Sequence, residues 1–200
     1  MKLRPRQEIF VDKCVNALVK HGNTLGVAVV GFGKSYSLSI VIDKMIKNHN
    51  AKKVIVLQHR TELKEQNRDK FNIATENNYT TSFVQGAKKD FSKQVVFGMI
   101  QTVGRNLDLL PKFDLAIIDE AHGIMAKRYL ETIKKLKELN PNVKLLGVTA
   151  TPNRGDGKGL GKVFSNVADV VSIEETIRAG HLVPPRTYSC LLYTSPSPRD

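Results

Sequence analysis

A glycine-rich turn followed by a lysine and a serine is the first part of this sequence whose residue types and spacing could do chemistry. The turn runs from position 28 to position 35, and its candidate phosphate-binding residues are Gly31, Phe32, Gly33, Lys34 and Ser35. Glycines let backbone N–H groups close around phosphate groups, and a helix that begins here adds a favourable dipole. The lysine then reaches the β- and γ-phosphates, and the serine hydroxyl binds Mg²⁺. Position 28 is alanine where the standard spacing has glycine, so a simple glycine turn after a strand stays open as the alternative.

Two adjacent carboxylates, Asp119 and Glu120, follow the apolar run 115–118. Open α/β sheets bind their ligands at the carboxyl ends of such buried strands. Asp119 can hold Mg²⁺ through water, and Glu120 can orient and deprotonate an attacking water. The alternative is that both carboxylates cap the next helix through its dipole. The phosphate loop upstream favours the catalytic interpretation.

A third apolar run, 145–148, ends in Thr149-Ala150-Thr151-Pro152. The two threonine hydroxyls can link the phosphate site to a neighbouring element by hydrogen bonds. Threonine is also common at strand ends and proline ends such elements, so a structural role is the alternative. Three strands that end in polar motifs at one edge of a sheet indicate a shared site.

Apolar runs alternate with helical patterns along the chain, and this alternation predicts the elements that position these motifs. Strands are expected at 25–30, 54–57, 94–100, 115–118, 145–148 and 167–171, with a short one near 81–84. Helices are expected near 34–48, 61–71, 129–139 and 174–179. The strands are continuous apolar runs, which is typical of burial on both faces. The prediction is an α/β fold with a parallel sheet covered by helices on each side.

Charge and composition favour some classes of function and exclude others. Lys and Arg number 31 against 19 Asp and Glu, giving +12, and residues 1–70 hold 14 basic and 6 acidic side chains. Such a basic half favours a polyanionic partner such as nucleic acid, with a lysine-rich solvated surface as the alternative. No apolar run approaches the roughly 20 residues of a membrane span, which excludes a transmembrane protein. Two cysteines make no disulfide framework, so we expect a reducing, cytoplasmic location.

The last residues, 190–200, differ sharply from the rest of the chain. They contain Ser-Pro-Ser-Pro and read as the translation of a transposase-type sequencing adapter. We expect this segment to be a disordered artefact of sequencing, and we exclude it from the fold. The natural domain is then expected to span residues 1–189.

Taken together, the motifs resemble those of the first RecA-like domain of a superfamily 2 helicase or translocase of the DEAD/DEAH-box group. The similarity is greatest to type III restriction subunits and to phage and bacterial DNA helicases. Residues 28–35 match the first motif of that group, which tolerates alanine at its first position, although Val29-Val30 replaces the usual Pro-Thr. Residues 119–122 match motif II, residues 149–151 match motif III, and the resemblance covers residues 3 to about 186.

The resemblance also implies roles for residues outside the phosphate loop. Gln7, within Leu3-Arg4-Pro5-Arg6-Gln7, would contact the adenine base. The implied nucleic-acid-binding residues are His59, Arg60, Gln101 and Thr102, and the implied coupling residues are His122, Thr149 and Thr151. A surface position for Gln7 and a helix-capping role for His59 and Arg60 stay open as alternatives.

The implied fold is a RecA-like doubly wound parallel sheet, a P-loop NTPase in a single domain. The implied activity is Mg²⁺-dependent ATP hydrolysis, with catalysis by Lys34, Asp119 and Glu120 and with Ser35 and Asp119 holding the metal. The partner would be nucleic acid, DNA rather than RNA, with a nuclease or modification subunit as a possible addition. A second RecA-like domain, which supplies an arginine in this group, is expected to be missing from this chain, so weak activity is expected. The alternatives are a P-loop ATPase of another class and a non-catalytic module that binds nucleotide or nucleic acid.

Overall fold

One eight-stranded sheet organises the computed structural model, which describes residues 3–59, 64–151 and 160–184. The strand order is β4-β3-β5-β2-β6-β7-β1-β8. The strands are β1 (Asn23–Ala28), β2 (Val54–Gln58), β3 (Thr81–Gln85), β4 (Lys88–Lys89), β5 (Val95–Met99), β6 (Leu115–Asp119), β7 (Lys144–Thr149) and β8 (Val167–Val171). The helices are α1 (Pro5–His21), α2 (Lys34–His49), α3 (Lys64–Ala74), α4 (Ile100–Val103), α5 (Lys127–Leu139) and α6 (Ile173–Arg178).

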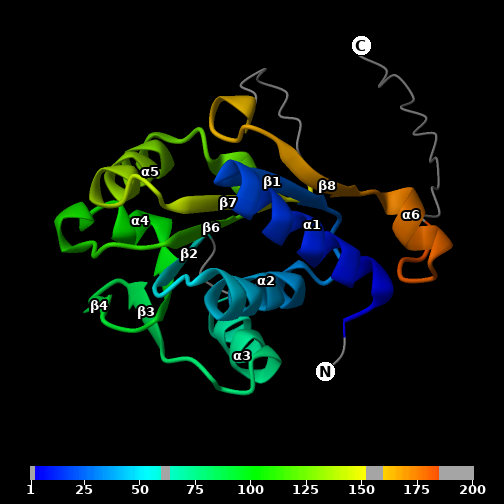
Figure 1. Cartoon of the computed structure of the whole chain (residues 1–200), viewed down its shortest axis with the longest axis horizontal. Coiled ribbons are helices and arrows are strands. Elements are labelled where there is room, and N and C mark those ends of the chain that lie inside the picture. The colour runs from blue at the N-terminus through cyan, green and yellow to red at the C-terminus, as the bar shows by residue number, and fades with distance from the viewer. Residues whose placement is uncertain (1–2, 60–63, 152–159, 185–200) are drawn as a thin grey trace, which may run out of the picture.

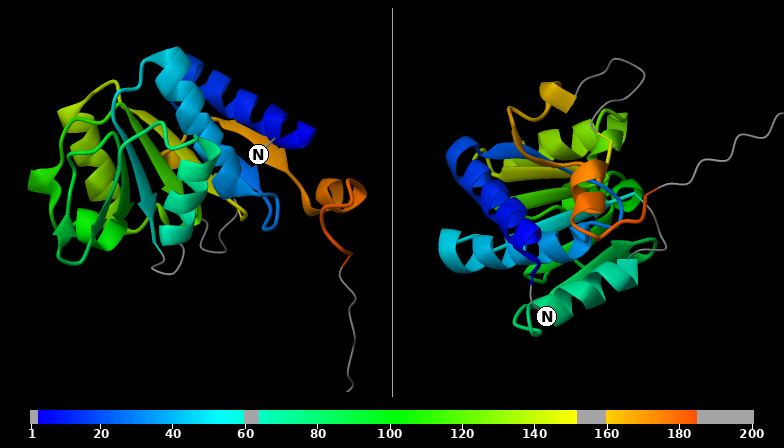
Figure 2. Two further views of the ribbon diagram at one scale, coloured as in Figure 1. Left: turned by 90° about the horizontal axis from the view of Figure 1, so that it is seen from below. Right: turned by 90° about the vertical axis from the view of Figure 1, so that its right-hand side faces the viewer.

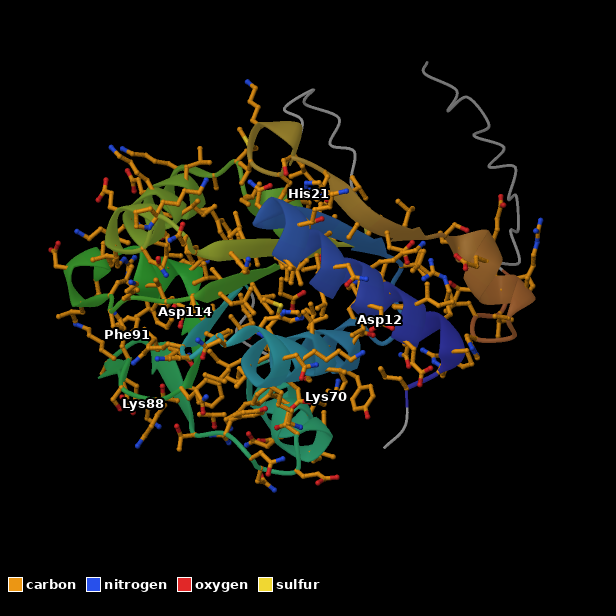
Figure 3. All side chains as sticks on the ribbon, in the orientation of Figure 1. Asp12, His21, Lys70, Lys88, Phe91 and Asp114 are labelled. Atoms are coloured by element: carbon orange, nitrogen blue, oxygen red, sulfur yellow. The ribbon has the colours of Figure 1, made fainter. Side chains whose placement is uncertain are left out.

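Neighbouring strands are parallel throughout the described sheet, except for the β3–β4 pair, which is antiparallel. Parallel strands require crossover connections, and helices supply several of them. Strand β4 is a short edge strand of two exposed lysines, one of which, Lys88, is labelled in Figure 3. Charge and short length on an edge strand oppose pairing with another sheet.

Helices cover both faces of the sheet (Figures 1 and 2). One apolar core packs α1, α2 and α3 against the strands, with Phe10, Met45 and Phe71 among its members. A second core on the opposite face packs α4 and α5, through residues such as Val103 and Leu136. Strands β2 and β5 are buried along their whole length, which explains their continuous apolar sequences.

Local sequence signals mark the ends of the first helix. Proline at the first position of α1 has a backbone angle suited to a helix start and lacks an N–H that would be unpaired there. Gly22 ends the helix in the left-handed conformation, with φ of 74°, and its N–H bonds to the carbonyl of Leu18. The chain then turns directly into β1.

The structure confirms the α/β class and the seven strands expected from the sequence, with differences at their ends. Strand β1 stops at Ala28, and Val30 is 74% exposed in the loop rather than part of the strand. Ile100 begins α4 instead of ending β5. Strand β4 and helix α4 were not expected, because two and four residues are too short for a periodic pattern. The tail 190–200 lies outside the described residues, and no described helix is long and apolar enough to cross a membrane.

A group of ion pairs holds β8 and α6 against α1. Arg6 pairs with Asp169 and Glu175, and Lys13 bonds to the second carboxylate oxygen of Asp169 at 2.8 Å. Burial by itself would raise the pKa of Asp169, but the hydrogen bonds and charges of Arg6 and Lys13 outweigh it and hold that pKa below its ordinary value. These contacts join segments more than 150 residues apart in the chain.

We predict that Asp169→Asn lowers the free energy of unfolding at pH 7 by roughly 1–3 kcal/mol, since the negative charge that pairs with Arg6 and Lys13, and one of its two acceptor oxygens, are lost. Because the folded pKa is depressed, this stabilisation is present above the unfolded value of about 3.9 and is lost as pH falls through the folded value. Urea unfolding at pH 7 and at steps down to pH 3 measures both effects.

The control is Asp12→Asn, which removes an exposed pair between α1 and Lys44 of α2. An exposed pair is worth less than about 1 kcal/mol. Equal losses in the two variants would contradict a special role for Asp169.

Candidate functional site

The glycine turn after β1 forms a loop that curls into the start of α2. Gly31 and Gly33 have φ angles of 85° and 93°, in the region that side chains other than glycine rarely adopt. Gly33 precedes the first residue of α2, and its carbonyl accepts the N–H of Ser37 at 3.1 Å. Phe32 is buried and packs edge-on against Phe10 of α1, with ring centroids 5.4 Å apart. The buried Phe32 side chain therefore anchors the loop to α1.

Lys34 lies across this loop. Its Nζ donates to the carbonyl of Ala28 at 3.3 Å and stands 3.9 Å from Oε1 of Glu120, and its side chain is 13% exposed. Both contacts are long, so they hold the ammonium group weakly. A phosphate group in the loop would offer the same ammonium group a stronger charge-assisted bond.

Gln7 reaches the same loop from α1. Its Nε2 donates to the carbonyl of Phe32 at 2.8 Å, and its Oε1 accepts the N–H of Arg4 at 2.9 Å. The guanidinium of Arg4 also donates to the Phe32 carbonyl. Gln7 is thus buried between helix and loop, and a cavity of about 90 Å³ beside it is lined by Arg4, Phe32 and Thr176, among others. Its contact with a base stays a prediction.

The two carboxylates stand at the end of β6, as the sequence predicts. Glu120 has φ of 56°, in the left-handed region, and its N–H donates to Oδ1 of Asp119 at 3.0 Å. Burial raises the pKa of Asp119 above its ordinary value, and the charge of Glu120 raises it further, while Lys34 acts in the opposite direction. An unusual backbone angle and a shifted pKa at a strand end are typical of functional carboxylates.

His122 joins motif II to the end of β7. Its Nδ1 lies 3.2 Å from Oε2 of Glu120 and 3.4 Å from Oγ1 of Thr149. The Thr149 hydroxyl in turn accepts the N–H of Thr151 at 3.2 Å. The residues expected to couple the sites are therefore in contact with one another and with Glu120. Their role in coupling stays a prediction.

A cavity of about 430 Å³ lies between the loop and the carboxylates. It is lined by Val30, Gly31, Gly33, Lys34, Ser35, Tyr36, Lys70, Ile73, Asp119 and Glu120. Its size falls within the usual range for small-molecule sites, and its donors suit a polyphosphate. Tyr36, Lys70 (labelled in Figure 3) and Ile73 were missed by sequence reasoning, since only the packing of α3 beside α2 brings the last two here.

The residues also fit a phosphate-bound magnesium ion. The described residues hold no cluster of three or more His, Cys, Asp or Glu that could bind a metal by themselves. Magnesium is usually held by one or two protein oxygens together with substrate phosphates and water. Ser35 and Asp119 line the cavity and provide two such oxygens.

Three of the expected nucleic-acid-binding residues, His59, Gln101 and Thr102, lie at the same edge of the sheet. His59 follows β2, and its Nδ1 lies 3.2 Å from Nε2 of Gln101 in α4. Thr102 accepts the N–H of Gly86 at 3.1 Å. A second cavity, about 630 Å³ in volume, runs from His59 to Glu120 and His122. Arg60 lies outside the described residues.

A parallel sheet whose first strand enters a phosphate loop, with paired carboxylates and a threonine motif ending neighbouring strands, defines a RecA-like P-loop domain of the superfamily 2 helicase type. The chain belongs to the family of the type III restriction enzyme, res subunit, which matches residues 1–154. Its described residues correspond to the first RecA-like domain of the superfamily 2 helicases.

The chain is similar to curated helicases along most of its length. The chain is 25% identical to the ATP-dependent RNA helicase DHX58 of Mus musculus, over 99% of this chain and 32% of that protein. It is 26% identical to the putative mitochondrial ATP-dependent helicase irc3 of Schizosaccharomyces pombe, over 93% of this chain and 32% of the relative. The chain thus spans about a third of the length of the curated relatives it matches.

Two solved structures have the same fold. A nuclease-deletion mutant of the Type ISP restriction-modification enzyme LlaGI, in complex with a DNA substrate mimic, superposes with a TM-score of 0.67 at 18% identity. The match covers 90% of this chain and 21% of LlaGI. The UvsW helicase of bacteriophage T4 gives a TM-score of 0.63 at 17% identity, over 84% of this chain and 60% of that one.

We predict that Gly33→Ala weakens ATP binding by roughly tenfold or more. The new Cβ would lie 2.5 Å from Nε2 of Gln7 at a φ of +93°, so the loop must shift. Fluorescence titration with a labelled ATP analogue in the presence of Mg²⁺ measures the affinity.

The matched control is Gly22→Ala, which has φ of +74° and no atom within 4 Å of the new Cβ. It carries the same kind of backbone strain away from the loop, so ATP affinity should stay at the wild-type value. Equal weakening in both variants would show that strain alone, rather than the loop geometry, is responsible.

Proposed function

We propose that this domain binds ATP and Mg²⁺ in the cavity between the glycine loop and motif II, and that it couples ATP hydrolysis to movement on DNA. The observation that carries the proposal is the series of contacts from Lys34 through Glu120 and His122 to Thr149. It links the phosphate loop to the strand end that faces the second cavity.

The chain's own residues would divide the chemistry of hydrolysis. The loop amides and Lys34 hold the β- and γ-phosphates and stabilise the charge that develops on them. Ser35 and Asp119 hold Mg²⁺, which when bound neutralises negative charge on the phosphate oxygens. Glu120 accepts a proton from water as the water oxygen attacks the γ-phosphorus and the bond to the bridging oxygen breaks, releasing ADP and phosphate.

Gln7 supports this site in the proposal by fixing the loop carbonyl of Phe32 and by contacting the base of the nucleotide. His122, Thr149 and Thr151 transmit the state of Glu120 toward the edge where the nucleic acid lies. His59, Arg60, Gln101 and Thr102 contact the nucleic-acid backbone there. Contacts with the backbone contribute to the affinity for nucleic acid but do not distinguish one base sequence from another.

A second RecA-like domain is part of the proposal. No arginine among the described residues lines the 430 Å³ cavity, whose cationic side chains are Lys34 and Lys70. An arginine finger is worth roughly 10³–10⁵ in rate in other phosphoryl-transfer enzymes. We propose that a further domain of the whole protein supplies it, and that DNA-processing activities such as a nuclease or modification subunit act with it.

We predict that Glu120→Gln retains ATP binding and lowers single-turnover hydrolysis by roughly 10²–10⁴-fold, because the general base is lost while the shape is kept. Lys34→Ala should weaken both steps, since the ammonium group contacts the phosphates before and during the reaction. Phosphate release with protein in excess over ATP measures hydrolysis, and a labelled ATP analogue measures binding. Unchanged hydrolysis in Glu120→Gln would favour a non-catalytic binding module.

We predict that this chain alone turns over ATP more slowly than ~1 s⁻¹, the low end of ordinary enzyme turnover, because no arginine of the described residues lines the 430 Å³ cavity. Steady-state hydrolysis with and without single-stranded DNA, and with RNA of the same sequence, measures this rate and its stimulation. Turnover at or above that rate would contradict the need for a second domain. Stimulation by neither nucleic acid would favour a P-loop ATPase of another class, and stimulation by RNA alone would replace DNA as the substrate.

A further inference from the structure

Arg128, which belongs to none of the family motifs, lies beside the expected nucleic-acid-binding residues. It is the second residue of α5, and its Nη1 donates to the backbone carbonyl of Gln101 at 3.4 Å. The side chain of Gln101 contacts His59 at 3.2 Å, and all of these contacts are exposed. The end of β2, helix α4 and the start of α5 therefore meet at one exposed point.

The packing of α5 against α4 fixes where Arg128 lies. A Cβ on Gly104, at the end of α4, would lie 3.5 Å from the Cβ of Arg128, so the two elements are in close contact. The hydroxyl of Thr132 donates to the carbonyl of Arg128 at 2.7 Å within the helix. The backbone of Arg128 is therefore packed against α4, and this packing sets the position from which its side chain extends.

The charge of Arg128 has no acidic partner among the residues that the structure describes. Elsewhere on α5, Lys127 pairs with Glu131 and Lys134 with Glu138. The Gln101 carbonyl occupies one of the five N–H donors of the guanidinium, which leaves donors for a further acceptor. A cation in the first turn of a helix is also disfavoured by the helix dipole, and no acidic residue in that turn offsets it.

We propose that Arg128 binds a backbone phosphate of the DNA strand that crosses His59 and Gln101. The guanidinium is planar and exposed, its Nη1 lies 3.4 Å from the Gln101 carbonyl, and it stands beside two side chains that are proposed to contact the nucleic-acid backbone. This arrangement suits a pair of phosphate oxygens. A polyanionic strand fits better than a small anion, because the site is an exposed junction of three segments rather than an enclosed pocket. This inference rests on the proposed nucleic-acid function of the same edge.

The test compares Arg128→Ala and Arg128→Gln with Lys127→Ala, which removes the same charge from the neighbouring position of α5. Fluorescence anisotropy with a labelled single-stranded DNA oligonucleotide of mixed sequence gives the affinity over a series of NaCl concentrations. Both Arg128 variants should bind about tenfold more weakly at low salt. In a plot of log affinity against log salt concentration, the slope for these variants should be smaller in magnitude than the wild-type slope by about 0.7. This is the change expected when one phosphate contact with a single strand is lost.

Arg128→Lys keeps the charge, and it should retain the wild-type salt slope with a smaller loss of affinity. Lys127→Ala should retain both the slope and the affinity, because its ammonium group already pairs with Glu131. Equal effects of Arg128→Gln and Lys127→Ala would overturn the proposal, since the charge would then act only as part of the general field. A wild-type slope in Arg128→Gln would overturn it as well.

Failure of this inference can be told apart from failure of the proposed function. If the wild-type chain does not bind DNA, the proposed function and the assignment of Arg128 are both wrong. If the wild-type chain binds DNA and the Arg128 variants have the same DNA affinity and salt slope as the Lys127 control, only the assignment of Arg128 is wrong.

Discussion

The parallel alignment of β1, β7 and β6 is the constraint on which the rest of this structure depends. Backbone pairing sets Val27 of β1 opposite Thr149, and Val148 opposite Asp119. Neighbouring strands lie about 4.8 Å apart, so residues that end these strands must meet at one edge. The loop after β1, the threonine motif and the carboxylates are therefore brought together by the pairing of the strands that precede them.

Glu120 occupies the boundary between two cavities at that edge. One cavity, of about 430 Å³, contains the glycine loop, and the other, of about 630 Å³, extends to His59. Glu120 lines both of them and contacts Lys34 on one side and His122 on the other. Asp119 and Val30 also line both cavities, but Glu120 makes side-chain contacts toward each of them, and the proposed coupling of the two sites rests on these contacts.

The phosphate loop also depends on contacts from distant parts of the chain. Gln7 of α1 and Arg4, which directly precedes that helix, hold the carbonyl of Phe32, and Arg6 ties the same end of α1 to β8 and α6. Because these bonds share one short stretch of α1, the last described elements and the loop are fixed to the same base. The small cavity beside Gln7 lies between them.

The sequence by itself determined seven of the eight described strands, the order of the motifs and the glycine turn after β1, because buried parallel strands and glycine turns leave local patterns. It also placed Asp119 and Glu120 at a strand end. Only the tertiary structure brought Lys70 and Ile73 into the phosphate cavity and Arg128 onto Gln101. Those positions depend on how α3 packs beside α2 and how α5 packs on α4, and side-chain contacts between elements distant in sequence leave no periodic signal in the chain.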